Sequence, residues 1–196
     1  MVATFLQQEI ASARFGAAVR ALLADAALPE TVVTRPDLRS RAENGRRRRL
    51  LAQHRGYGKG VDGYLAGFPT RGVRWGWWSL SAQELLRVRY IRWGYWLELS
   101  GGTRLPMDAA ARVRAGVEPF GVSNERFVTA AAQIRQGATL PPLILVRPTH
   151  ERHPAGLVVL EGHLRLTAYA LAADAMPAEL EVLIGSSPAV AKWWGY

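Results

Sequence analysis

The chain has 196 residues and a net charge of +9, and 49% of its residues are hydrophobic, which is enough to build a sizeable core. It contains no cysteine, which excludes disulfides, thiolate nucleophiles and cysteine-bound zinc. No apolar run reaches the roughly 18–20 residues that cross a bilayer, and the first residues lack the features of a secretory signal, so we expect a cytoplasmic protein without a membrane partner.

Residues 1–72 are predicted to form an Arg-rich helical N-terminal region. Apolar residues at helical spacing predict a helix over residues 4–26, and Val32 and Val33 are interpreted as a short strand or an extended linker. A second helix is predicted over residues 37–54 with Asp37 as its cap. It carries four consecutive arginines, residues 46–49, which face all sides of a helix. We therefore predict a solvated helix in which one or two of these arginines have partners.

Residues 73–196 are predicted to form a second domain that alternates strands and helices. Strands are predicted over residues 73–80, 143–146 and 157–160, and helices over residues 108–115 and 124–136. Ser81 and Glu84 form a capping-box pattern that starts a further helix. The chain ends in Trp-Trp-Gly-Tyr, which is too apolar for a free tail, so we expect these residues to pack back onto the domain.

The most informative segment is residues 157–172, where a short apolar run stops at a glycine and a helix-forming stretch follows at once. A helix start of this kind leaves free backbone N–H groups and is suited to binding an anion. Glu161, Gly162, His163 and Arg165 add a carboxylate, an imidazole and a guanidinium within five residues. This composition predicts a site that handles phosphate; the alternative is a helix-capping turn with a salt bridge between Glu161 and Arg165.

These residues resemble the phosphate-binding motif of the ParB/sulfiredoxin superfamily. Gly162, Arg165 and Ala168 occupy positions of the partition-protein pattern Gly-Glu-Arg-Arg-x-x-Ala, whereas His163 and Leu164 replace its Glu and its first Arg. Sulfiredoxins carry a catalytic cysteine where this chain has His163, so the absence of cysteine excludes their chemistry. The motif is most similar to the acid-Gly-His-x-Arg pattern of the free-serine kinases on this fold.

The resemblance implies an α/β (α+β) domain of the ParB/sulfiredoxin type, with a small mixed sheet flanked by helices. It further implies a nucleotide (ATP, ADP or CTP) bound with Mg²⁺ by Gly162, His163, Leu164, Arg165 and Thr167. Glu161 is then the residue that holds the metal or activates the acceptor, and His163 contacts the transferred group. The implied function is a small-molecule kinase or a related phosphotransferase or nucleotidase.

Two further segments are candidates for the same site. Ser100, Gly101, Gly102, Thr103 and Arg104 combine two glycines, two hydroxyls and a guanidinium, which suits the second substrate or the distal phosphates. The alternative is a plain turn. The resemblance to the serine kinases also implies a catalytic glutamate in the region where the helix of residues 124–136 begins. Glu118, just before this helix, is the first candidate and Glu125 the second; a solvated carboxylate is the alternative.

Two other functions stay open. The positive charge and the arginine run favour a DNA-associated ParB-like protein, either a partition-type factor or a nuclease, with a DNA reader built on the N-terminal helices. Partition proteins carry a helix-turn-helix after the motif domain, and only about 25 residues follow the predicted motif helix here. The third interpretation is a catalytically silent nucleotide sensor.

Overall fold

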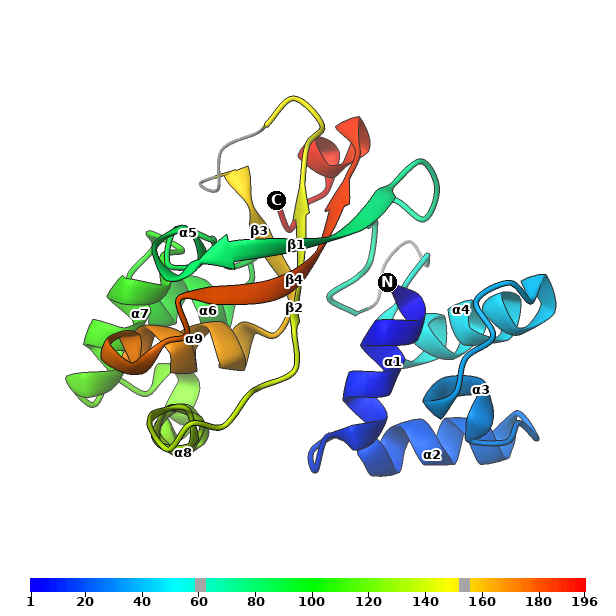
Figure 1. The fold of residues 1–196 in the computed structure, drawn as a ribbon, viewed down its shortest axis with the longest axis horizontal. Helices are drawn as coiled ribbons and strands as arrows, with labels where there is room; N and C mark the ends of the chain where they lie inside the picture. Colours follow the sequence, from blue (N-terminus) through cyan, green and yellow to red (C-terminus); the bar gives the residue numbers. More distant parts are fainter. Residues whose placement is uncertain (59–62, 152–155) are drawn as a thin grey trace. The chain divides into compact units, whose positions relative to one another are not determined.

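The computed structural model describes residues 1–58, 63–151 and 156–196, and within these ranges the predicted α+β fold is confirmed. The chain divides into two compact units, Met1–Arg71 and Gly72–Tyr196. Figure 1 shows helices in the described part of the first unit and the mixed sheet in the second. None of the helices in these ranges combines the length and the apolar character needed to cross a bilayer.

The helical unit begins with two helices where the sequence predicts one. Ser12 interrupts the predicted helix: it is extended (φ −75°, ψ 132°), and its hydroxyl accepts a hydrogen bond from the Arg14 amide. After this turn Gly16 lies so close to Ile10 that a Cβ at Gly16 would be 2.6 Å from the Ile10 carbonyl oxygen. The helices of this unit are α1 (Val2–Ala11), α2 (Gly16–Asp25), α3 (Thr31–Thr34) and α4 (Arg41–Arg55).

Two further expectations for this unit are wrong. Val32 and Val33 lie in the helical turn α3, where both side chains are buried. Ser40 caps α4 in place of Asp37, because its hydroxyl accepts a hydrogen bond from the Glu43 amide at 3.2 Å. The chain between α3 and α4 is therefore longer than the pattern indicated, and Asp37 lies within it.

The arginine run is confirmed as a helix with one internal partner network. Arg47 is fully buried, and its guanidinium donates to the carbonyl oxygens of Val32 (2.8 Å) and Asp37 (2.7 Å). It also donates to Asn44 Oδ1 (2.8 Å) and to Glu43 Oε2 (2.9 Å). The other three arginines of the run are exposed. Arg47 thus ties α3 and the following loop to α4.

The sheet unit is built on four strands in the order β1-β4-β2-β3, counted over the described residues. β1 and β3 pair antiparallel with their neighbours β4 and β2, whereas β2 and β4 pair parallel. β2 and β3 are buried along almost their whole length, as strands covered on both faces are. The strands are β1 (Arg74–Ser81), β2 (Leu143–Arg147), β3 (Val158–Glu161) and β4 (Glu179–Ser186).

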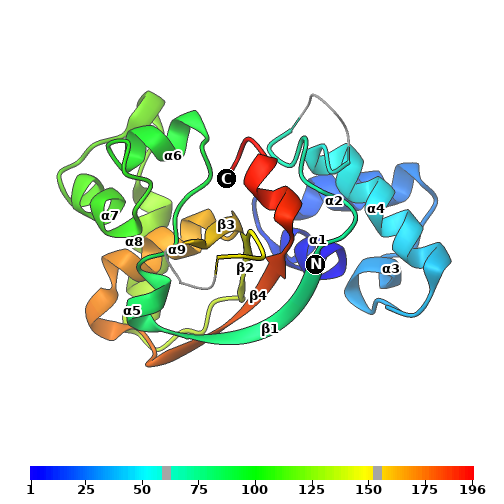
Figure 2. The same ribbon diagram turned by 90° about the horizontal axis from the view of Figure 1, so that it is seen from above.

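Helices of this unit share one hydrophobic core with the sheet, and Figure 2 shows α6 to α9 gathered beside it. The core joins Val113, Ile134 and Leu166 of three helices to Leu145 and Ile184 of two strands. The Ser81 capping box is confirmed, although it starts only one helical turn. The helical elements are α5 (Ala82–Leu85), α6 (Gly94–Leu99), α7 (Pro106–Arg114), η1 (Pro119–Gly121), α8 (Glu125–Arg135), α9 (His163–Leu171), η3 (Ala173–Ala175) and η4 (Pro188–Lys192).

The aromatic C-terminal segment packs back onto the sheet unit, as predicted. Trp193 is buried, and the Trp194 ring lies 5.7 Å from the ring of Trp93. The Gly195 carbonyl oxygen accepts hydrogen bonds from the Arg92 amide and from Arg104 Nη2, both at 3.2 Å. The last residues are therefore part of the folded unit.

Candidate phosphate-binding site

The phosphate-binding motif forms a sharp turn between β3 and α9. Gly162 has φ 102° and ψ 24°, in the left-handed region that favours glycine. A Cβ on Gly162 would overlap Leu143 Cδ2 and would lie 2.9 Å from Arg165 Nη2. Glycine is therefore required at this position for two reasons: the positive φ and the lack of space for a Cβ atom. Because of this turn, α9 begins at His163, directly after the end of a buried strand.

The two ends of α9 are treated differently. At its C-terminal end, Arg114 Nη2 of α7 and Arg135 Nη2 of α8 donate to the Leu171 carbonyl oxygen at 3.0 and 2.6 Å. At its N-terminal end, the N-cap residue is Gly162, which has no side chain that could cap the helix. Cations at the C-terminal end complement the helix dipole. The helix start offers the positive end of the same dipole, which suits an anion.

Glu161 and Arg165 form an ion pair across the turn. Arg165 Nη2 donates to Glu161 Oε1 at 3.2 Å, and Arg165 Nη1 donates to the Pro141 carbonyl oxygen at 3.3 Å. Both side chains are largely buried, with 12% of Arg165 and 18% of Glu161 exposed. The salt bridge considered in the sequence analysis is therefore present. It places the guanidinium and the carboxylate of the motif side by side next to the helix start.

His163 faces inward against aromatic side chains. Its ring is stacked on the Trp96 ring at 4.9 Å with an interplanar angle of 17°, and the Tyr90 ring stacks on the same indole at 5.0 Å and 14°. Only 8% of His163 is exposed. The imidazole that was predicted to contact the transferred group therefore forms part of a packed aromatic group, which Tyr95 completes by meeting Trp96 edge-on.

A chain of neutral hydrogen bonds runs beneath this aromatic group. Thr167 Oγ1 donates to the His163 carbonyl oxygen at 3.0 Å and lies 2.7 Å from the Tyr90 hydroxyl. Thr167 was predicted to contact the nucleotide, but it is fully buried and its hydroxyl is used here. Burial raises the pKa of the Tyr90 phenol well above its usual value. Tyr90 therefore stays neutral and serves as the donor to Thr167.

The second predicted segment, Ser100 to Arg104, is a turn that supports the first. Ser100 Oγ donates to the Trp96 carbonyl oxygen at 2.7 Å and accepts the Arg104 amide at 2.9 Å. Thr103 Oγ1 donates to the Ser100 carbonyl oxygen at 3.0 Å. Gly101 and Gly102 have φ values of 62° and 87°, which the turn requires. The hydroxyls predicted to bind substrate are therefore occupied within the turn, and substrate binding here stays a prediction.

Arg104 joins this turn to the aromatic group. It is buried, with φ 65°, and its Nε donates to the Tyr90 carbonyl oxygen at 2.7 Å. Burial, followed by the neighbouring charges of Arg89 and Arg92, lowers the pKa of Arg104 to about 10. The two predicted sites thus connect through Tyr90 and Trp96, neither of which was predicted as a site residue.

The glutamate candidates separate. Glu118 Oε1 accepts a hydrogen bond from the Asn124 amide at 3.2 Å, so it closes the loop that leads into α8. Glu125 instead lines a pocket of about 400 Å³ beside the start of α9. The pocket is lined by Glu125, Arg126, Thr129, Ala130, Gln133 and Leu164. Polar residues at positions 125, 129 and 133 share one face of α8, and Leu164 belongs to the motif itself.

The described residues contain no group of three or more His, Asp or Glu side chains that would hold a metal by themselves. Glu161 is the one carboxylate of the motif. This donor set fits Mg²⁺ only together with phosphate oxygens and water, which is how Mg²⁺ is commonly held. No family model, curated protein or solved structure matches this chain.

Proposed function

We propose that the protein binds a nucleotide at the start of α9 and, with Mg²⁺, transfers a phosphoryl group to a small-molecule acceptor. The observation that carries the proposal is the turn at Gly162, where a helix with a glycine N-cap starts next to Arg165, Glu161 and the Glu125 pocket. A local fold of the ParB/sulfiredoxin type is part of this proposal. It is supported by the mixed sheet and by the order helix, strand, strand, turn, helix, strand over residues 125–186.

The chain's own residues divide the work as follows. The backbone N–H groups at the start of α9 and the Arg165 guanidinium bind phosphate oxygens. Arg165 turns to a phosphate by giving up its contact with Glu161, and the Glu161 carboxylate then becomes available to a cation. Glu161 would hold Mg²⁺ together with phosphate oxygens and water, and the ion would supply charge neutralisation of the phosphates. Glu125 is the carboxylate placed to accept a proton from an acceptor in the adjacent pocket, while His163 and its aromatic partners hold the helix start in position.

The experiment is a thermal-shift panel with ATP, ADP and CTP, each with and without Mg²⁺. A nucleotide at about a hundred times its Kd stabilises the folded state by about 2.7 kcal/mol. We expect one nucleotide to shift the wild type, and Arg165→Ala to abolish the shift. Arg87→Ala, which removes an exposed arginine of the same unit, is the control and keeps it. If no nucleotide shifts the wild type, or if Arg165→Ala responds equally, the proposal is wrong.

Turnover distinguishes the related functions. A kinase forms ADP only when a pool of small-molecule acceptors is added, and Glu125→Gln and Glu161→Gln each reduce that rate. A nucleotidase releases phosphate without acceptors. The burial of His163 against Trp96 favours a nucleotide sensor as the second candidate, because a packed imidazole is better suited to positioning than to chemistry. A sensor gives the thermal shift and no turnover.

A further inference from the structure

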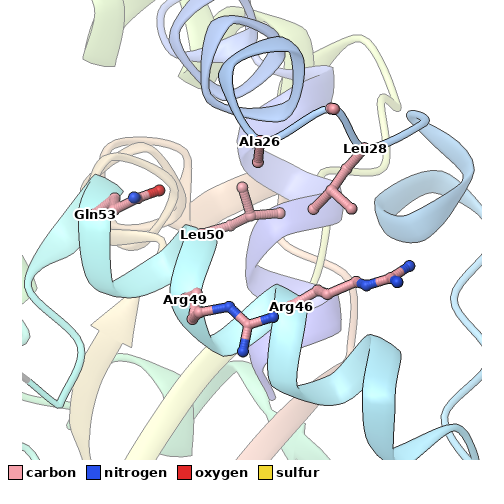
Figure 3. A pocket seen from close by; sticks show the side chains of 7 residues that line it. Ala26, Leu28, Arg46, Arg49, Leu50 and Gln53 are labelled. Carbon is pink, nitrogen blue, oxygen red and sulfur yellow. The ribbon is translucent and has the colours of Figure 1, made fainter.

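A second candidate site lies in the helical unit, between α4 and the end of α2. It is a pocket of about 320 Å³, within the size range of small-ligand sites. Figure 3 shows Leu28 and Leu50 pointing toward the hollow, Arg46 extending from α4 beneath Leu28, and Arg49 lying along α4 beside it. The residues that line it are Ala26, Ala27, Leu28, Arg46, Arg49, Leu50 and Gln53.

The lining residues of α4 form one face of the helix. Arg46, Arg49, Leu50 and Gln53 follow the spacing i, i+3, i+4, i+7. Two guanidiniums and an amide therefore border an apolar floor. This combination matches a phosphate that carries a sugar or a base. Each guanidinium can donate two parallel hydrogen bonds to phosphate oxygens, and the leucines can pack against the carbon face of the sugar or base.

Among the described residues of this unit, some arginines already have acidic partners, whereas Arg46 and Arg49 do not. Arg20, Arg47 and Arg55 form ion pairs with Glu30, Glu43 and Glu9. In the part of residues 1–71 that the structure describes, Arg46 and Arg49 are exposed, form no ion pair, and share the pocket with no acidic side chain. Their charge is therefore available to a ligand.

The balance of charge points to a polyanion. Residues 1–71 hold 12 of the 25 basic residues of the chain and 6 of the 16 acidic ones, a net charge of +6. Arg41 and Arg48 on the same helix are also exposed. A positive field of this kind attracts an extended polyanion more strongly than a single nucleotide, because several phosphates act together.

We infer that the pocket of Arg46, Arg49 and Gln53 binds a phosphodiester group of a nucleic acid strand, with the attached sugar or base on Leu28 and Leu50. This inference uses no residue of the α9 site and holds or fails independently of the proposed nucleotide chemistry.

The test is fluorescence anisotropy of the full chain with labelled single-stranded and duplex oligonucleotides at several salt concentrations. The key variant is Arg46→Gln with Arg49→Gln. Its control is Arg41→Gln with Arg48→Gln, which removes the same charge from the same helix outside the pocket. All four residues are exposed, so both double variants should fold, and thermal melting checks this.

The pocket variant should bind at least about tenfold more weakly, because it loses hydrogen bonds to a charged group, whereas the control should lose less than about threefold. Arg46→Lys with Arg49→Lys should recover part of the affinity, since lysine keeps the charge without the paired donors. With that difference between the variants, the oligonucleotide that binds more tightly shows whether the pocket prefers a single strand or a duplex.

Three results would overturn it. Equal losses in the pocket variant and the control would mean diffuse electrostatic attraction without a site. Displacement of the oligonucleotide by a mononucleotide at the same phosphate concentration would mean a small-molecule pocket. The absence of binding at low salt would remove nucleic acid as a ligand altogether.

Discussion

The two units differ in the polar network that each buries most deeply, although the sheet unit also buries the guanidinium of Arg104. The helical unit buries charges: Arg47 has 0% exposure, and the buried Glu9 carboxylate accepts hydrogen bonds from His54 and from Arg55 Nη2. The sheet unit buries a neutral chain beneath its site, in which the hydroxyls of Tyr90 and Thr167 lead to the His163 carbonyl oxygen.

This difference has energetic consequences. Removing one partner of a buried ion network leaves an uncompensated charge or several unsatisfied acceptors, and costs more than removing a neutral hydroxyl from a hydrogen-bonded chain. The helical unit should therefore be the more sensitive of the two to single substitutions of its buried polar residues. The stability of the sheet unit should depend most on the backbone conformation of the turn at Gly162.

The largest effect is expected for Arg47→Ala. The substitution leaves the Val32 and Asp37 carbonyl oxygens without this donor, removes the ion pair of the Glu43 carboxylate, and opens a cavity in the helical unit. Urea unfolding should show a loss of about 3–5 kcal/mol. Arg48→Ala, an exposed neighbour, should change the free energy of unfolding by less than about 0.5 kcal/mol. Similar values for the two variants would remove the contrast between the units.

An intermediate effect is expected for Gly162→Ala in the sheet unit. The new Cβ meets Leu143 and Arg165 at a positive φ, so strain and overpacking together should cost about 3 kcal/mol. Gly137→Ala is the matched control, because Gly137 also has a positive φ (86°) but has no atom within 4 Å of an added Cβ. It should cost about 1 kcal/mol. Urea unfolding measures the loss of unfolding free energy for both variants, and a larger loss for Gly162→Ala supports the steric constraint. An equally small loss for both variants would show that the turn at Gly162 is not under steric constraint.

The smallest effect is expected for Tyr90→Phe, which keeps the aromatic stack and removes the hydrogen bond to Thr167. It should cost about 1 kcal/mol at neutral pH. Because the folded pKa of Tyr90 is raised, the unfolded chain loses this proton first as pH rises above about 10. The contribution of the neutral Tyr90 phenol to the free energy of unfolding is thus fully present below that pH. Above it, this contribution falls by about 1.4 kcal/mol per pH unit.

Chemical unfolding between neutral and alkaline pH tests this sign. Tyr90→Phe should show a shallower alkaline decline than the wild type. Thr167→Val, which breaks the same hydrogen bond but leaves the phenol in place, should keep the wild-type slope. If Tyr90→Phe and Thr167→Val behave alike at high pH, titration of Tyr90 does not contribute.

Local sequence signals predicted much of the sheet unit. The capping box at Ser81 and the glycine after β3 each determine a local turn of the chain through residues close in sequence. Both turns were predicted, and the structure contains both. The Glu161–Arg165 pair was also considered from the sequence, although Glu161 ends β3 and the turn at Gly162, not helical spacing, brings it to Arg165. By contrast, the break at Ser12 was missed, because apolar residues continue at helical spacing on both sides of it.

The surroundings of the site were beyond local signals. Tyr90 and Trp96 reach His163 from a segment far upstream, and aromatic residues there have the same pattern whether they line a site or fill a core. The Arg46–Arg49 pocket is also a tertiary feature, because its floor includes Leu28 from the other side of α3. The sequence predicted that only one or two arginines of the run have partners. Only the fold shows that Arg47 is the arginine with hydrogen-bond partners.

The carbonyl oxygen of Leu171 couples three helices, because it accepts hydrogen bonds from two of them. Because guanidiniums of α7 and α8 meet on this one atom, a displacement of α9 along its axis must move two other helices with it. The helix is nine residues long, so this carbonyl oxygen lies about 13 Å from the helix start. We therefore expect a ligand that stabilises α9 also to slow amide exchange in α7 and α8, because both helices are hydrogen-bonded to its last residue.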